Sequence, residues 1–367
     1  MPNEPGELDQ NSERYLENAL ANGSAILFTG AGFSRGARNQ LDEPLPLVRE
    51  LAQDLWGLAF PGEVFDPASA LGDVFEVARR SAGNATRRLL EQKLLVVGDT
   101  VADYYRDYLT VPWFKIYTLN LDNLIPIAAA KFALPTDITS VSALRPRSVT
   151  GLAAVHLNGL VGDYPDVTFS PPQFGARTAG ADPYYEILAR ELYGHPVVFI
   201  GTALDEPPLW HHLALRGDRP SGSELRPKSF LVSPSLPVAR RAMLERYNVK
   251  WVAMGAEEFC ARYVSPAIAS GRIVPRETSP VTPTFEDVAM VRGLPAPDLA
   301  DFLLGRDPQW ADVSQGFAIP RTCEQDITDR LARGDVKALV VTGTAGEVVP
   351  VVVEVEVAVS RSRPAGW

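Results

Sequence analysis

Short, mostly apolar runs alternate with longer stretches of helical spacing along most of the chain. Each run is too short for a helix, and such runs are typical of buried strands in a parallel sheet. The runs lie at 25–28, 114–117, 153–155, 197–200, 229–232 and 250–252. Helices are expected at 45–59, 68–80, 84–96, 122–133, 183–193, 206–215, 236–247 and 255–269. This alternation predicts an α/β fold with a doubly wound, Rossmann-like parallel sheet, whose ligands bind at the carboxyl ends of the strands.

The pattern also indicates how the chain is organised. A block of expected helices at about 45–110 interrupts the alternation and predicts a helical subdomain beside the sheet. Five prolines between residues 275 and 297 indicate a linker. We therefore expect one domain at 1–272, a linker at 273–298 and a separate segment at 299–367.

Charge and hydropathy exclude several classes of protein. The 367 residues include 35 basic and 45 acidic side chains, a net charge of −10, which argues against strong nucleic-acid binding because that requires a cationic surface. An anionic ligand would instead be held by backbone N–H groups or by a helix N-terminus. No run approaches the roughly 18 apolar residues of a membrane helix. The N-terminus lacks the basic-then-apolar order of a signal peptide, so we expect a cytoplasmic protein.

The cysteine content excludes two further kinds of structure. Cys260 and Cys323 are the two cysteines of the chain, and no Cys-x-x-Cys pair is present. They cannot form a four-cysteine zinc site or a disulfide framework. We expect no metal site.

A glycine-containing turn follows the first expected strand, in Thr29-Gly30-Ala31-Gly32-Phe33-Ser34. Glycines there let the backbone approach a diphosphate, but a tight strand-to-helix turn needs them as well. No acidic residue follows a second strand about 20 residues later, so an ordinary Rossmann dehydrogenase fits poorly. The same stretch matches the G-x-S-x-G nucleophile elbow, with Ser34 ahead of Asp122 and His156. Too few strands precede it for an α/β-hydrolase, so a serine hydrolase is disfavoured.

Three more polar turns follow later strands. Thr118-Leu119-Asn120-Leu121-Asp122 follows the second expected strand, His156-Leu157-Asn158-Gly159 the third, and Gly201-Thr202-Ala203-Leu204-Asp205 the fourth. Asp122 could simply cap the next helix, whereas Asn120 is free of that duty and is the better candidate for the site. All four turns are expected to meet in one crevice at the edge of the sheet.

The order of these motifs resembles the sirtuin-like NAD-binding domain, especially its bacterial antiphage NAD hydrolase branch, over about residues 20–260. The resemblance implies NAD as substrate. The expected NAD-binding residues are Gly30, Ala31, Gly32, Phe33, Ser34, Thr118, Gly201, Thr202, Ala203 and Ser233. The expected catalytic residues are Asn120, Asp122, His156 and Asn158.

The chain departs from that family in two places. Residues 160–195 contain no cysteine, so the zinc ribbon of the sirtuin deacetylases is missing, and the resemblance implies NAD cleavage more than deacylation. Asn158 stands where the family has histidine, and His156 lies two residues earlier. Residues 156 and 158 point to the same side if the strand continues, so His156 is the candidate base.

The function expected from the resemblance is NAD+ glycohydrolysis to nicotinamide and ADP-ribose, in an abortive-infection antiphage effector. We expect a homo-oligomer or a partner-gated enzyme with a phage-derived or other trigger, because unrestrained NAD cleavage would poison its host. Asn158 leaves open an alternative, a non-catalytic sensor of NAD or ADP-ribose on the same fold.

The C-terminal segment contains a further motif. Lys337–Thr342 and the following Gly343-Thr344-Ala345-Gly346 resemble the start of a P-loop NTPase domain of the STAND type. The Gly-Lys-Ser/Thr that should come next is replaced by Val348-Val349-Pro350. We therefore expect a truncated or degenerate remnant without triphosphatase activity.

Overall fold

The computed structural model divides the chain into two units, Met1–Ser279 and Pro280–Trp367. The residues that it describes are 6–134, 136–145, 151–179, 182–204, 209–210, 227–275 and 333. The predicted linker beyond residue 275, the P-loop remnant except Arg333, and most of the helix expected at 206–215 lie outside the described residues and stay predictions. Among the described residues, no helix combines the length and apolarity needed to cross a membrane.

A parallel sheet forms the centre of the first unit, and its strands run in the order β3-β4-β2-β1-β5-β6-β7. The strands are β1 (Ile26–Thr29), β2 (Lys115–Thr118), β3 (Ile138–Ser142), β4 (Leu152–His156), β5 (Val197–Ile200), β6 (Ser229–Val232) and β7 (Val249–Val252). All neighbouring pairs are parallel. The predicted doubly wound α/β fold is confirmed. The edge strand β3 was not predicted, because Thr139 and Ser140 break its apolar pattern.

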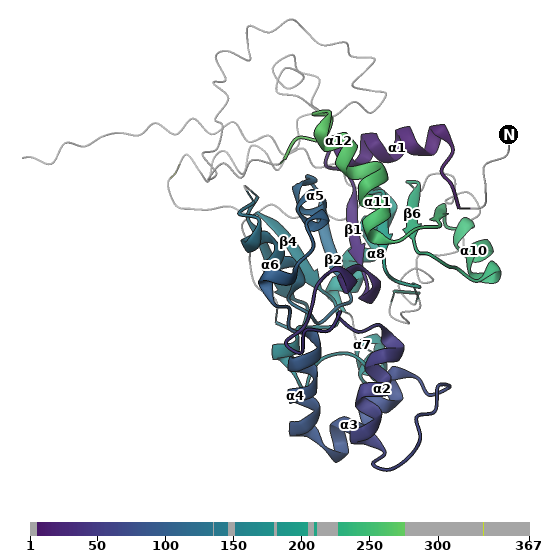
Figure 1. Cartoon of the computed structure of the whole chain (residues 1–367). Coiled ribbons are helices and arrows are strands. Elements are labelled where there is room, and N and C mark those ends of the chain that lie inside the picture. The colour runs from purple at the N-terminus through teal and green to yellow at the C-terminus, as the bar shows by residue number, and fades with distance from the viewer. Residues whose placement is uncertain are drawn as a thin grey trace, which may run out of the picture. The chain divides into compact units, whose positions relative to one another are not determined.

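Helices cover both faces of the sheet (Figure 1). One face packs on α1 (Gln10–Ala21), α5 (Tyr104–Thr110), α6 (Leu124–Lys131), α11 (Ala256–Phe259) and α12 (Ser265–Ala269). The other packs on α8 (Pro183–Gly194) and α10 (Val238–Glu245). Successive residues of β1 alternate between the two cores, with Leu27 in the first and Ile26 and Phe28 in the second. Both faces of the strand are buried, which explains its uniformly apolar sequence.

A helical module of α2 (Val48–Ala59), α3 (Leu71–Ser81) and α4 (Gly83–Leu94) has a hydrophobic core of its own. Figure 1 shows these three helices gathered at one end of the sheet, near α7 (Pro171–Ala179). The module core includes Leu121, from the turn after β2, and Val161, from the turn after β4. The module is therefore anchored on the carboxyl ends of the strands. The expected helical block at 45–110 divides between two cores, because α5 packs in the main one.

The turns after β1 and β5 approach each other backbone to backbone. The Gly32 N–H donates to the Gly201 carbonyl at 2.9 Å, and the Gly30 N–H donates to the Ile200 carbonyl at 2.9 Å. A Cβ on Gly201 would lie 2.1 Å from the Phe33 nitrogen, and Gly201 has a φ of +70°. In the sheet, β1 and β5 are neighbours. The strand that follows β1 in the chain, β2, lies on one side of this pair, and the strand that follows β5, β6, lies on the other. The contact between the two turns therefore lies at the topological switch point of the sheet.

We expect Gly201→Ala to destabilise the first unit by about 3 kcal/mol or more, because it adds both backbone strain and steric overlap. Gly57→Ala is the matched control, since Gly57 lies inside α2 with nothing within 4 Å of the added carbon. That change should stabilise the protein by up to about 1 kcal/mol. Urea unfolding of both variants measures the difference, and equal stabilities would contradict the backbone contact.

Candidate active site

A cavity of about 330 Å³ opens where β1, β2, β4 and β5 end. This volume is at the low end of the range for ligand pockets. The sheet side of the cavity carries the polar groups, on Ser34, Asn120, Asp122, Asn158 and Thr202. The four predicted turns therefore meet in one place, as expected for strand ends at a switch point.

Most of the predicted site residues line this cavity, but some do not. The lining includes Gly30, Ala31, Ser34, Asn120, Asp122, Asn158, Gly201, Thr202 and Ala203. Gly32, Phe33, Thr118, His156 and Ser233 are not part of it.

A polar network joins Ser34, Asn120 and Asp122. The Ser34 hydroxyl donates to Asp122 Oδ2 at 2.7 Å, and Asn120 Nδ2 donates to Ser34 Oγ at 2.9 Å. Asn120 Nδ2 also donates to the Gly30 carbonyl at 3.0 Å. Both amide hydrogens are thereby used, which fixes the orientation of the side-chain amide. Asn120 Oδ1 is left as an acceptor for a ligand or a water in the cavity.

Asp122 is a buried carboxylate on the wall of the cavity. Its Oδ1 accepts the Leu124 N–H at 3.1 Å, so it also serves the start of α6, as the capping interpretation expected. Burial raises the pKa of Asp122 to about 6, although its hydrogen bonds act in the opposite direction. Near neutral pH the carboxylate is therefore mostly ionised but is poised to accept a proton.

His156 lies behind Asn120 and not in the cavity wall. Its ring is 1% exposed, Nδ1 lies 2.9 Å from the Asn120 carbonyl oxygen, and Nε2 lies 3.1 Å from Ser140 Oγ. Since a carbonyl only accepts, Nδ1 carries the proton, and Nε2 accepts from the Ser140 hydroxyl. Burial lowers the pKa of His156 to about 4, so the ring is neutral. The predicted role of His156 as base has no direct route to the cavity in this arrangement.

The same contacts bear on the serine hydrolase alternative. Ser34 is bonded to Asp122 and Asn120, whereas His156 is bonded to Asn120 and Ser140. A nucleophile elbow requires the serine beside the histidine and the histidine beside the acid. The described residues therefore contain no Ser-His-Asp triad at this motif.

The remaining predicted residues pack against or hydrogen-bond to the turns outside the cavity wall. Phe33 is buried against Tyr105 and Tyr108, with ring centroids 5.2 Å away in each case. Thr118 Oγ1 accepts the Asn120 N–H at 3.1 Å. At the end of β6, the Ser233 hydroxyl donates to the Ser235 carbonyl at 2.7 Å. These residues shape or flank the site without lining it.

The glycine turn offers fewer amide donors than the sequence suggested. The N–H groups of Gly30, Gly32 and Phe33 donate to carbonyls of the protein. The Ala31 N–H has no partner among the described residues, and Ala31 lines the cavity. Within this turn, Ala31 is therefore the clearest backbone donor for an anionic ligand.

An apolar wall lines the side of the cavity opposite the polar turns, and the sequence did not reveal it. It is formed by Leu45, Pro46, Leu47, Val48, Leu51, Leu71, Leu94, Phe169 and Phe174. Most of these residues belong to the helical module or to the segment that leads into it. In the sequence they are indistinguishable from ordinary helix-core residues, so only their position in space identifies them.

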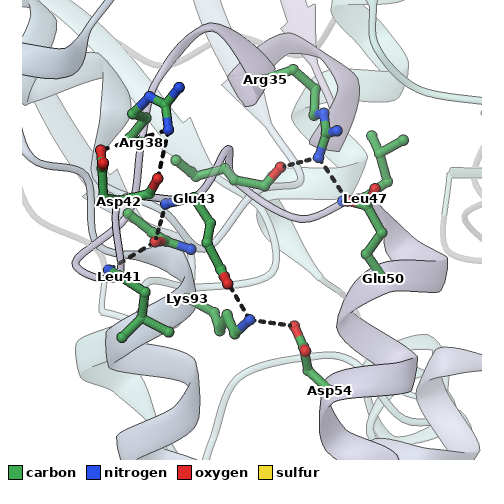
Figure 2. A network of polar contacts seen from close by, with 11 residues as sticks. Arg35, Arg38, Leu41, Asp42, Glu43, Leu47, Glu50, Asp54 and Lys93 are labelled. Atoms are coloured by element: carbon green, nitrogen blue, oxygen red, sulfur yellow. Dashed lines mark hydrogen bonds and ion pairs between the residues drawn. The ribbon is translucent and has the colours of Figure 1, made fainter.

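The segment before α2 is fastened by a polar network (Figure 2). Arg35 Nη1 donates to the Leu45 carbonyl at 2.9 Å and to Glu50 Oε2 at 2.7 Å. The same carboxylate oxygen accepts the Leu47 N–H at 2.8 Å. Because Arg35 follows Ser34 directly, one short helix, η1 (Ala31–Gly36), carries both the site serine and the contact that holds the apolar wall.

A second ion-pair group ties this segment to the module helices. Lys93 on α4 lies 2.7 Å from Glu43 Oε2 and 3.1 Å from Asp54 Oδ2 on α2 (Figure 2). Pairs near the surface are individually worth little, but a shared lysine holds three segments in one arrangement. Across the described ranges, no group of three or more His, Cys, Asp or Glu residues could hold a metal ion.

Comparisons with known proteins found no matching family model and no matching curated protein. Among solved structures, the chain is similar to a mutant Sir2 homologue in complex with 2′-O-acetyl ADP ribose, at 13% identity and a TM-score of 0.38, covering 72% of this chain and 98% of that one. It is also similar to a structure solved for the mechanism and regulation of Sir2 enzymes, at 15% identity and a TM-score of 0.35, covering 71% and 99%. At these identities the similarity concerns the fold alone.

Proposed function

We propose that the chain is an NAD+ glycohydrolase, which cleaves the bond between nicotinamide and ribose and releases nicotinamide and ADP-ribose. The observation that carries the proposal is the Ser34–Asn120–Asp122 network on the wall of a cavity at the switch point of the sheet. The resemblance of the strand-end motifs to the sirtuin-like family supplies the substrate.

The chemical groups around the cavity match those of a dinucleotide. The Ala31 N–H is a donor for phosphate oxygen, and Asn120 Oδ1 is an acceptor for a ribose hydroxyl or a water. The apolar wall, with Phe169 and Phe174, suits a flat aromatic base. Gly201 and Thr202 extend the polar side toward β5, where the resemblance places the adenosine half.

Cleavage requires stabilisation of positive charge on the ribose. As nicotinamide leaves as a neutral molecule, the charge that it carried passes to the sugar, in an oxocarbenium-like transition state. Among the described residues that line the cavity, Asp122 is the one charged side chain. A carboxylate in a site shielded from water stabilises such a cation more strongly than it would in bulk solvent.

Water completes the reaction at the anomeric carbon. We assign Asn120 Oδ1 to orient this water, because the amide is fixed and its oxygen is free of partners among the described residues. The proton that the water loses passes to Asp122 through the Ser34 hydroxyl, which already donates to that carboxylate. A pKa of about 6 suits a group that accepts a proton near neutral pH.

His156 is then a positioning residue and not the base. Its Nδ1–H holds the carbonyl of Asn120, and its burial keeps the ring neutral. This assignment replaces the role expected from the sequence and leaves Asp122 as the group that takes the proton.

One observation favours the alternative, a non-catalytic sensor of NAD or ADP-ribose. Both ring nitrogens of His156 are occupied, and Asp122 already accepts two hydrogen bonds from the protein. A sensor would be stabilised thermally by NAD without releasing nicotinamide, so the two functions are separable with one purified sample.

The cellular role proposed from the resemblance is abortive infection in the cytoplasm. Cleavage of the host NAD pool would stop phage growth at the expense of the cell. Such an enzyme requires restraint, which we assign to homo-oligomerisation or a partner, released by a phage-derived or other trigger.

Asn120→Ala should lower kcat/KM for nicotinamide release by about 100-fold or more, within the usual range for loss of proton-transfer or orienting groups. Asn84→Ala is the matched control, because Asn84 is exposed on α4 and the chemical change is identical. Chromatographic measurement of nicotinamide from NAD tests both variants. Equal losses in the two variants, or none in Asn120→Ala, would remove Asn120 from the mechanism.

The protonation states in this mechanism also predict how stability depends on pH. Asp122 has a raised pKa, so its contribution to stability increases as pH falls from about 6 to about 4. His156 has a lowered pKa, so its contribution decreases as pH falls from about 6.5 to about 4. The two terms, each about 3 kcal/mol at 1.36 kcal/mol per pKa unit, nearly cancel in the wild type.

Single substitutions should separate the two terms. Relative to wild type, Asp122→Asn should lose stability on acidification, and His156→Gln should gain it. Free energies of unfolding in urea between pH 4 and 7 provide the measurement. Curves for both variants that run parallel to the wild type would mean that neither buried group has the protonation state used here.

A further inference from the structure

Asn158 is held at both ends of its side-chain amide. It is buried in the wall of the cavity, its Nδ2 donates to the Leu119 carbonyl at 3.3 Å, and its Oδ1 accepts the Tyr185 hydroxyl at 3.3 Å. A reversed amide would place its oxygen against the Leu119 carbonyl, which is repulsive. The orientation is therefore fixed, and one N–H of Nδ2 has no partner among the described residues.

Tyr185 is in turn fixed by Arg177. Tyr185 on α8 is fully buried, and the Arg177 guanidinium lies 4.9 Å from the centre of its ring. Arg177 also donates to the Leu157 carbonyl, the residue just before Asn158. Its charge is compensated by Asp182, with Nη2 2.5 Å from Oδ2. A single cation thus contacts both the turn that carries Asn158 and the ring that orients its amide.

The ion pair is well shielded from solvent. The side chains of Arg177 and Asp182 are 12% and 10% exposed. Asp182 also caps α8, accepting the Tyr184 and Tyr185 N–H groups at 3.0 and 3.1 Å. Asp182 therefore holds the backbone of Tyr185, and Arg177 contacts its ring. Together these contacts leave the hydroxyl little freedom to move.

We propose that Tyr185 and Arg177 are positioning residues that make Asn158 a fixed hydrogen-bond donor toward the cavity, so that the ligand group bound there is an acceptor such as a ribose oxygen. This inference rests on the proposed function for the identity of the ligand. It differs from the interpretation based on the sequence, in which Asn158 replaced the histidine that the family has at this position. Here the site uses a donor that does not titrate, in place of a base.

The test is a double-mutant cycle on the affinity for ADP-ribose, the proposed product, measured by calorimetry with the full chain. Tyr185→Phe removes only the hydroxyl and should weaken binding about 3- to 10-fold, the usual value of one hydrogen bond. In an Asn158→Ala background the same change should have no effect, because its target is gone. Tyr184→Phe is the matched control on the same helix and should leave the affinity unchanged. Arg177→Lys, which keeps the charge but loses the fork of N–H groups, should behave like Tyr185→Phe.

The possible outcomes distinguish a failure of the positioning role from a failure of the proposed function. An equal loss from Tyr185→Phe in both backgrounds, or an equal loss from Tyr184→Phe, would overturn the positioning role even if NAD is cleaved. If the wild type neither binds ADP-ribose nor cleaves NAD, the proposed function fails. The positioning role is then decided by the same cycle on unfolding free energies, where coupling between residues 185 and 158 supports it and additivity overturns it.

Discussion

The close approach of two backbone turns is the constraint on which the rest of the site depends. Gly30 and Gly32 after β1 meet Gly201 after β5 at distances that exclude any side chain. This contact closes the switch point of the sheet and directs the turn that carries Ser34 toward the end of β2. The glycines that the sequence suggested for a diphosphate are therefore required first by the protein itself.

The cavity beside that contact has one polar side and one apolar side. The sheet side presents two hydroxyls, two amides and a buried carboxylate, and each is held by further hydrogen bonds to the protein. The opposite side is apolar and comes from the helical module and the segment fastened by Arg35 and Lys93. Under the proposed function, the apolar side would hold a flat base and the polar side would keep the sugar next to fixed dipoles. Preorganised dipoles and a shielded carboxylate are what charge development on a sugar requires.

The fold and the polar half of the site were predictable because both depend on local sequence. Strands buried on both faces have uniformly apolar runs, and polar turns directly after them identify the strand ends. The edge strand β3 was not predicted because Thr139 and Ser140 interrupt its apolar residues with polar ones. Roles that depend on partners distant in sequence could not be predicted. His156 was expected as a base, but Ser140 and the Asn120 carbonyl occupy its ring, and the orientation of Asn158 is set by Tyr185 on a later helix.

In the proposed reaction, water adds to the ribose of NAD in this cavity after nicotinamide departs. Incubation of the purified full chain with NAD in oxygen-labelled water, followed by mass spectrometry of the products, tests it most directly. We expect unlabelled nicotinamide and ADP-ribose carrying one labelled oxygen, with both products formed more slowly by about 100-fold or more in Asn120→Ala. Unchanged NAD under conditions where NAD measurably stabilises the protein against heat would contradict it and identify the chain as a sensor.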